Sequence, residues 1–121
     1  MRITIHNAVS SRNKLKKRRI TMIQIKNLKA AKPENPWDVR VDRASVLGNP
    51  FYLENESQRD EVCNKYEEWF RTNKDPAFQM MLDKLCKLYA EYGQLNLFCW
   101  CAPKRCHSET IRQYVIERQI L

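Results

Sequence analysis

One nine-residue segment near the C-terminus holds most of the residue types that carry out chemistry in proteins. Three of the chain's five cysteines fall within eight residues, and a histidine follows directly. The segment, called here the cysteine loop, reads Cys99-Trp100-Cys101-Ala102-Pro103-Lys104-Arg105-Cys106-His107. Thiolates and imidazoles serve as nucleophiles, bases and metal ligands. The cysteine loop is therefore predicted as the functional site.

A metal centre is one hypothesis for this loop. Cys99, Cys101, Cys106 and His107 supply enough sulfur and nitrogen for tetrahedral zinc. Their spacing, Cys-x-Cys-x4-Cys-His, is not that of a standard zinc knuckle, and adjacent residues point at one ion only with difficulty. Zinc is kept as an alternative cofactor, in which the domain is a zinc-stabilised module that interacts with another protein, such as a host protein.

A reactive thiol is the second hypothesis. Cys106 would be the nucleophile and His107 its base or orienting group, with the N–H groups of a following helix as an oxyanion hole. Neighbouring side chains at a helix start usually diverge, so this pair would need a further partner. Cys106 and His107 are the candidate catalytic residues under this hypothesis.

The third hypothesis is a pocket that binds an anion without thiol chemistry. Residues 95–100 predict a strand and a helix is expected from about Ser108, so the loop would join a strand end to a helix N-terminus. Ligands of open α/β sheets bind beyond the carboxyl ends of strands. A helix N-terminus attracts phosphates and carboxylates, and Lys104 and Arg105 would add positive charge.

A purely structural interpretation also remains open. Buried cysteines commonly pack as small apolar residues, and His107 could make only local hydrogen bonds at the helix start. Cys63 and Cys86 lie beside apolar helical stripes and are expected in the core. Trp100 is expected in the core as well, with stacking on a base as an alternative.

A second segment with unusual residues runs from Arg43 to Phe51. Gly48 permits a positive φ angle, and the proline after Asn49 disfavours helical geometry there. The segment therefore predicts a turn or a shaped loop. Phe51 and Tyr52 are expected to anchor its far end in the core.

Periodicity predicts the elements that position both segments. Ser57, with Asp60 three residues later, predicts the cap of a first helix, and Asp75 and Gly93 predict the two ends of a second. The remaining expected elements are strands near residues 23–28, 38–43 and 95–100, and a last helix from about 108. This order predicts a small single α/β domain, with a short mixed or parallel sheet packed by about three helices.

The net charge of +8 is unevenly distributed. Residues 1–21 carry 7 of the 22 basic residues and no acidic one, whereas residues 22–121 carry 15 basic and 14 acidic residues. Residues 1–21 are thus expected to form a basic arm outside a nearly neutral domain, residues 22–121. Blocks of basic residues bind nucleic-acid phosphates, so a nucleic-acid binder using this arm is another alternative. Met22 is a second candidate translation start.

No stretch approaches the roughly 20 apolar residues that span a bilayer, and the first residues do not resemble a secretory signal. We therefore expect a cytoplasmic protein without a membrane partner. In such a compartment five cysteines favour free thiols or metal ligands over a disulfide framework.

Two signatures give the chain a family resemblance. They are Arg43-x-Ser45-x-x-Gly48-Asn49-Pro50-Phe51 and Leu97-x-Cys99-Trp100-Cys101-x-Pro103-x-x-Cys106-His107. Together with Tyr66-x-x-Trp69 they resemble a phage and bacterial family, domain of unknown function 4326, over roughly residues 36–119. The chain departs from the family at Leu47, where members often have tryptophan, and at Ser108, where glycine is common. The resemblance implies no established activity, and for a phage protein it implies the host cytoplasm.

The resemblance also implies that the two segments form one site. Arg43 would pair with a phosphate or carboxylate, and Asn49 would read a base or a sugar hydroxyl. The leading hypothesis is therefore a composite anion pocket for a nucleotide or nucleic-acid fragment, and it leaves open whether the ligand is also processed. The candidate ligand-binding residues are Arg43, Ser45, Gly48, Asn49, Cys99, Cys101, Lys104, Arg105 and Ser108.

Overall fold

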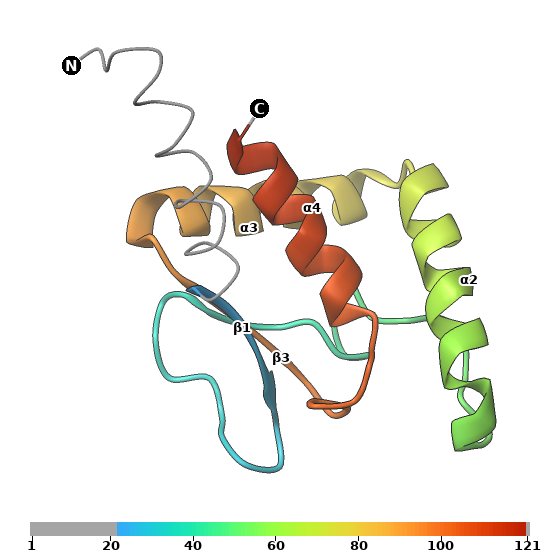
Figure 1. The fold of residues 1–121 in the computed structure, drawn as a ribbon. Helices are drawn as coiled ribbons and strands as arrows, with labels where there is room; N and C mark the ends of the chain where they lie inside the picture. Colours follow the sequence, from blue (N-terminus) through green and yellow to red (C-terminus); the bar gives the residue numbers. More distant parts are fainter. Residues whose placement is uncertain (1–21, 121) are drawn as a thin grey trace, which may run out of the picture.

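A computed structural model describes residues 22–120, which form a three-stranded sheet and three α-helices (Figure 1). The strands are β1 (Ile23–Asn27), β2 (Asp38–Arg40) and β3 (Leu95–Cys99). The helices are α2 (Arg59–Thr72), α3 (Pro76–Tyr92) and α4 (Ser108–Ile120), and a 3-10 turn, η1 (Glu56–Gln58), precedes α2. The predicted small α/β domain is confirmed.

The sheet is wholly parallel and β3 is its central strand, in the order β1-β3-β2. Ile25 of β1 and Val39 of β2 both lie opposite Leu97 of β3. These residues therefore share one face of the sheet, because side chains alternate along a strand. Every residue of β3 is buried, as expected for the central strand of a parallel sheet.

The helices cover this apolar face. One buried cluster joins the sheet residues Ile23, Leu95 and Leu97 to apolar side chains of all three helices. Among the helical residues in the cluster are Tyr66, Phe70, Phe78, Leu82, Leu85, Ile111, Val115 and Ile116. α3 and α4 also contact each other, and Figure 1 shows them lying against the sheet. The core therefore holds the ends of β2 and β3 in fixed positions.

Two of the predicted helix ends are confirmed and one is wrong. The Asp75 carboxylate accepts a hydrogen bond from the Phe78 N–H at 3.2 Å, and Gly93 ends α3 with a φ of 70°. Ser57 does not cap α2 but lies inside η1, and Asn55 accepts the Ser57 N–H at 3.1 Å. Because Asn is as good a cap as Ser, the earlier polar residue starts the turn.

The Arg43–Phe51 segment forms a compact loop that packs through its backbone. The Leu47 carbonyl accepts a hydrogen bond of 2.7 Å from the buried Tyr66 hydroxyl. Gly48 does not have a positive φ; a Cβ atom there would lie 2.5 Å from the Asp42 carbonyl oxygen. Glycine is needed here for close approach and not for its φ. Tyr52 is 77% exposed, so the expected anchoring in the core is wrong for this residue.

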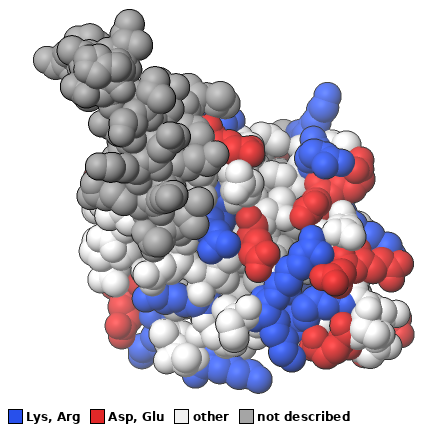
Figure 2. All heavy atoms as spheres, viewed as in Figure 1, with Lys and Arg blue, Asp and Glu red and all other residues white. Residues whose placement is uncertain are grey.

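Charged residues of both signs are mixed on the surface in Figure 2. This agrees with the nearly equal numbers of basic and acidic residues after residue 21. No helix within residues 22–120 is both long enough and apolar enough to cross a membrane. The predicted basic arm, residues 1–21, lies outside the described residues.

Candidate functional site

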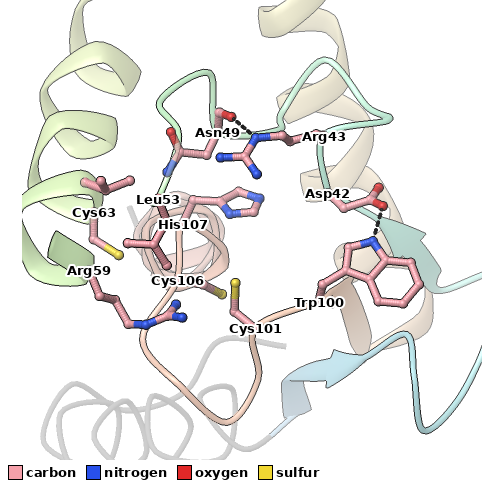
Figure 3. Close-up of a pocket in the computed structure, with 11 residues that line it drawn as sticks. Asp42, Arg43, Asn49, Leu53, Arg59, Cys63, Trp100, Cys101, Cys106 and His107 are labelled. Atoms are coloured by element: carbon pink, nitrogen blue, oxygen red, sulfur yellow. Dashed lines mark hydrogen bonds between the residues drawn. The ribbon is translucent and has the colours of Figure 1, made fainter. Parts of the chain in front are cut away.

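The site lies where two neighbouring parallel strands end. The Arg43–Phe51 loop follows β2 and the cysteine loop follows β3, so both leave the sheet at the same edge. Between them and α2 lies a pocket of about 370 Å³ (Figure 3). It is lined by Asp42, Arg43, Asn49, Leu53, Arg59, Val62, Cys63, Trp100, Cys101, Cys106 and His107. The two segments that the sequence singled out therefore share one cavity.

Hydrogen bonds fasten the two loops to each other. The Trp100 indole N–H donates to Asp42 Oδ2 at 2.9 Å, and His107 Nε2 bonds to the Val41 carbonyl. Asn27, the last residue of β1, donates from Nδ2 to the Ala102 carbonyl at 2.7 Å. The carboxyl ends of all three strands therefore position the cysteine loop.

The Arg43 side chain donates hydrogen bonds to carbonyls of its own loop and also lines the pocket (Figure 3). Its Nε donates to the Asn49 carbonyl at 3.0 Å and one terminal nitrogen donates to the Phe51 carbonyl at 2.6 Å. The guanidinium also lies 4.7 Å from the centre of the Tyr52 ring. Within residues 22–120 no carboxylate forms a salt bridge with it. Its positive charge is therefore not neutralised by an acidic partner there.

Asp42 is a buried carboxylate that stays ionised. Burial alone would raise its pKa, but hydrogen bonds from Arg40 and Trp100 lower it below the usual value. Arg40 forms a salt bridge with it at 2.5 Å. The carboxylate is thus occupied by two donors and serves to hold the Trp100 indole at the pocket.

Arg59, at the start of α2, is a charged pocket residue that the sequence did not indicate; Asp42, Leu53 and Val62 were also not among the candidates. Its guanidinium bonds both Glu56 oxygens, at 2.7 and 2.8 Å, and donates to the Arg105 carbonyl at 2.9 Å. The pair with Arg59 lowers the pKa of Glu56 to about 2. The pKa of Arg59 is raised, mainly by its hydrogen bonds to Glu56 and to a smaller extent by its hydrogen bond to Cys101. No spacing rule ties residue 59 to the two motifs, because only the tertiary fold brings α2 to the cavity.

His107 lines the pocket as a neutral, oriented imidazole. Only 7% of the residue is exposed, and burial lowers its pKa. Because a carbonyl only accepts hydrogen bonds, Nε2 carries the proton in its bond to Val41. Nδ1 is then the basic nitrogen. The Tyr66 ring packs edge-on against the imidazole, 5.1 Å between centres.

Three thiols meet beside His107. The sulfurs of Cys99 and Cys106 are 3.4 Å apart, and both residues are buried. Hydrogen bonds from Cys101 and, to a smaller extent, Cys106 lower the pKa of Cys99. Hydrogen bonds with Cys101 and Cys99, together with burial, raise the pKa of Cys106. Cys101 is only half-buried and lines the pocket. It is the member of the three that a solute in the pocket can reach best.

The two basic residues expected to add charge to the pocket face elsewhere. Lys104 lies 3.3 Å from the Glu56 carboxylate. Arg105 pairs with Asp60 at 3.0 Å and Glu67 at 3.1 Å, both on α2. Neither residue lines the cavity. Lys104 thus fastens the cysteine loop to η1, and Arg105 fastens it to α2.

Several other residues expected to contact a ligand lie behind the pocket lining and do not reach the cavity. Ser45 Oγ donates to the Asp42 carbonyl at 3.0 Å and accepts the Leu47 N–H at 3.2 Å, which shapes the turn. Gly48 and Ser108 do not line the pocket, and Ser108 is fully buried near the thiols. Cys99 is likewise behind the wall. Of the nine candidate ligand-binding residues, those in the cavity wall are Arg43, Asn49 and Cys101.

Trp100 does not lie in the core, contrary to the expectation. It is 51% exposed and follows the last residue of β3, so it no longer obeys the burial pattern of the strand. Cys63 is buried as predicted but also lines the cavity, whereas Cys86 is only half-buried.

Zinc was the alternative cofactor that the cysteine loop suggested. No three His, Cys, Asp or Glu side chains within residues 22–120 are grouped so that they could hold an ion. His107 directs Nε2 to the Val41 carbonyl, away from the thiols.

Comparison with known families agrees with the resemblance seen in the motifs. The model of the domain of unknown function family DUF4326 matches residues 23–117. The chain belongs to this family. The match covers all three strands and the pocket, so the pocket is a feature of this DUF4326 domain and not of an added segment. No curated protein and no solved structure matches the chain significantly.

Proposed function

We propose that this DUF4326 domain binds a nucleotide, or the phosphate-bearing end of a nucleic-acid fragment, in the pocket between its two loops. The observation that carries the proposal is the combination of two arginines and a half-exposed indole on one cavity. Guanidinium groups recognise phosphate oxygens, and an indole face stacks on a base. A nucleotide presents both a phosphate and an aromatic base.

The phosphate would lie between Arg43 and Arg59, which approach the cavity from opposite sides (Figure 3). Arg43 brings a charge that is not paired with an acid within the described part of the chain. Its two carbonyl contacts hold the guanidinium in place before a ligand arrives. Such preorganisation reduces the entropy lost on binding.

The base would stack on Trp100. The bond from its indole N–H to Asp42 fixes the ring, and half of the residue remains exposed. A stacked base contributes about 1–3 kcal/mol in single-stranded nucleic-acid binders. The cavity, at about 370 Å³, lies at the lower end of the range of small-molecule sites. This size favours one nucleotide over a long strand.

A second candidate function is processing of the bound ligand, with His107 as the base. A neutral imidazole on the cavity wall, oriented through one nitrogen by a backbone carbonyl, is the arrangement that general bases use. Cys106 suits the role of nucleophile less well, because it is 4% exposed and its pKa is raised. Hydrolysis of a nucleotide that is lost in His107→Gln, with binding retained, would support processing.

Titration calorimetry with the full chain tests the binding proposal. The probes are the four nucleoside 5′-monophosphates, the matching nucleosides, and a 5′-phosphorylated tetranucleotide, which separates free nucleotides from nucleic-acid ends. Arg43→Gln and Arg59→Gln each remove a pocket guanidinium. Arg71→Gln is the matched control, because Arg71 is an exposed residue of α2 that does not line this pocket. A hydrogen bond to a charged group is worth about 1.5–3 kcal/mol, so each pocket variant should bind about 10- to 100-fold more weakly.

Arg71→Gln should bind within about twofold of the unmodified chain, a difference well under 1 kcal/mol. A protein lacking residues 2–21 should bind equally well, because the proposal depends on Arg43, Arg59 and Trp100, which all follow residue 21. Equal losses in the pocket variants and in Arg71→Gln would reject the proposal. So would nucleosides that bind as tightly as nucleotides, or binding that disappears with the arm.

A further inference from the structure

The thiol cluster combines one accessible sulfur with two shielded ones. Cys99 and Cys106 are 1% and 4% exposed, with their sulfurs 3.4 Å apart. Cys101 hydrogen-bonds to both, and its sulfur and that of Cys106 point toward each other in Figure 3. A cavity wall thus presents one thiol to solutes and keeps its partners within reach behind it.

We propose that Cys101 is a peroxide-reactive thiol and that Cys106 is its resolving partner. The proposal concerns the redox chemistry of the chain and does not depend on the ligand of the pocket. It follows from three contacts: the opening of Cys101 to the cavity, its contact with Arg59, and its contact with a second thiol.

A small electrophile can reach Cys101 through the cavity that this residue lines. The Arg59 guanidinium contacts its sulfur from the side of α2. The cavity is large enough for hydrogen peroxide. Cys63 also lines the cavity, but it is 5% exposed and burial raises its pKa, so it should react more slowly.

The chemistry balances with hydrogen peroxide as the oxidant. The Cys101 thiolate attacks one peroxide oxygen, the O–O bond breaks, and the leaving hydroxide takes a proton to become water. Cys101 is now a sulfenic acid. The Cys106 sulfur then attacks the Cys101 sulfur, the S–O bond breaks, and hydroxide leaves with the Cys106 proton as a second water. Two thiols lose two electrons in total, and peroxide is reduced to water.

Cys99 can replace Cys101 as the disulfide partner of Cys106. Attack of its sulfur on Cys106 forms a Cys99–Cys106 disulfide and releases Cys101, which regains a proton as Cys99 loses one. The separation of 3.4 Å between the Cys99 and Cys106 sulfurs places this exchange within a small side-chain rotation. Either bond ties Cys106 to the strand end.

Peptide mapping after peroxide treatment of the full chain distinguishes the bonds. Trypsin cuts after Lys87, Lys104, Arg105 and Arg112, so a disulfide from Cys106 to Cys99 or Cys101 joins peptide 88–104 to peptide 106–112. A Cys99–Cys101 bond stays within one peptide. The Cys99→Ser variant leaves Cys101 as the partner within peptide 88–104, and dithiothreitol should separate the joined peptides again.

A dimedone probe tests which thiol reacts first. Cys101 should form the sulfenic-acid adduct at least about tenfold faster than Cys86, which is similarly half-buried but stands on α3 away from the cluster. Cys106→Ser should increase the Cys101 adduct because no resolving thiol remains, whereas Cys86→Ser should not. The joined peptide and the rate ratio in the unmodified chain need no variant to fold.

The proposal is overturned if Cys86 and Cys101 label at equal rates, or if peroxide leaves peptides 88–104 and 106–112 separate. It is also overturned if the protein purified without chelator holds zinc that blocks all three thiols. A joined peptide that is reversed by dithiothreitol, with early labelling at Cys101, supports it.

Discussion

Gly48 makes the closest backbone approach that a substitution can test. A Cβ atom at this position would lie 2.5 Å from the Asp42 carbonyl oxygen and 2.6 Å from the Arg43 Cα atom. Ordinary contacts begin near 3.4 Å, so Gly48→Ala requires a backbone shift of about 0.9 Å. Both obstacles are main-chain atoms, and no side-chain rotation removes them.

The cost can be estimated from the bonds that would have to move. Overpacking in a close-packed region costs about 1–3 kcal/mol. The Asp42 carbonyl also accepts the Ser45 N–H at 2.9 Å and Ser45 Oγ at 3.0 Å, and weakening these bonds adds up to about 1 kcal/mol. We therefore expect Gly48→Ala to lower the free energy of unfolding by about 2–3 kcal/mol.

Gly93 provides the matched control. It has a φ of +70°, and a Cβ atom there meets nothing within 4 Å. Gly93→Ala should therefore cost only the left-handed strain of an L-residue, about 1–2 kcal/mol. Urea unfolding followed by tryptophan fluorescence measures both variants. Because Arg43 is displaced only in Gly48→Ala, that variant alone should also bind nucleotide more weakly. If Gly48→Ala proves as stable as the unmodified chain, or more stable than Gly93→Ala, close approach does not explain the glycine.

Two further predictions concern His107 and the cap of α3. Burial lowers the pKa of His107, so below about pH 6.5 the unfolded chain takes up a proton that the folded chain resists, and the free energy of unfolding should fall by up to about 1.4 kcal/mol per pH unit. Urea titrations at pH 7.5 and 5.5 measure this loss, and His107→Gln, whose amide can still donate to Val41, should remove most of it; an unchanged pH dependence would contradict the assignment. Asp75→Ala removes the acceptor of the Phe78 N–H and should cost about 1 kcal/mol in the same assay, whereas Asp75→Asn should cost less, and equal losses would argue against a capping role.

Local patterns were sufficient for the elements and for the position of the site. Asp75 and Gly93 mark helix ends through single hydrogen bonds and one φ angle, which depend only on nearby residues. The cap predicted at Ser57 is wrong because another polar residue that can cap, Asn55, lies two positions earlier and begins the turn. The family resemblance, and not a local pattern, predicted that the two loops share a site; in the structure they meet because neighbouring parallel strands end at the same edge.

The partners of each side chain could not be read from the chain. Arg105 looked like a ligand contact, but its charge is taken up by Asp60 and Glu67, which lie 45 and 38 residues away. Arg59 lines the pocket, although it is far from both motifs in the sequence, because α2 packs beside the cysteine loop. Trp100 is a large aromatic residue of the type found in cores, but it lies just past the end of β3, where its indole N–H donates to Asp42. Long-range pairing decides these cases, and no local spacing encodes it.

The pocket residues divide into those that build the walls and those that are free to vary. Asp42 and Trp100 each lie within two residues of a strand end, and their bond joins the two loops. Replacing either should loosen the cavity whatever it binds. Leu53 and Val62 line the same cavity, and no side-chain hydrogen bond can hold the loops through them. Ligand preference should therefore be adjustable at Leu53 and Val62, whereas changes at the strand ends alter whether a pocket exists.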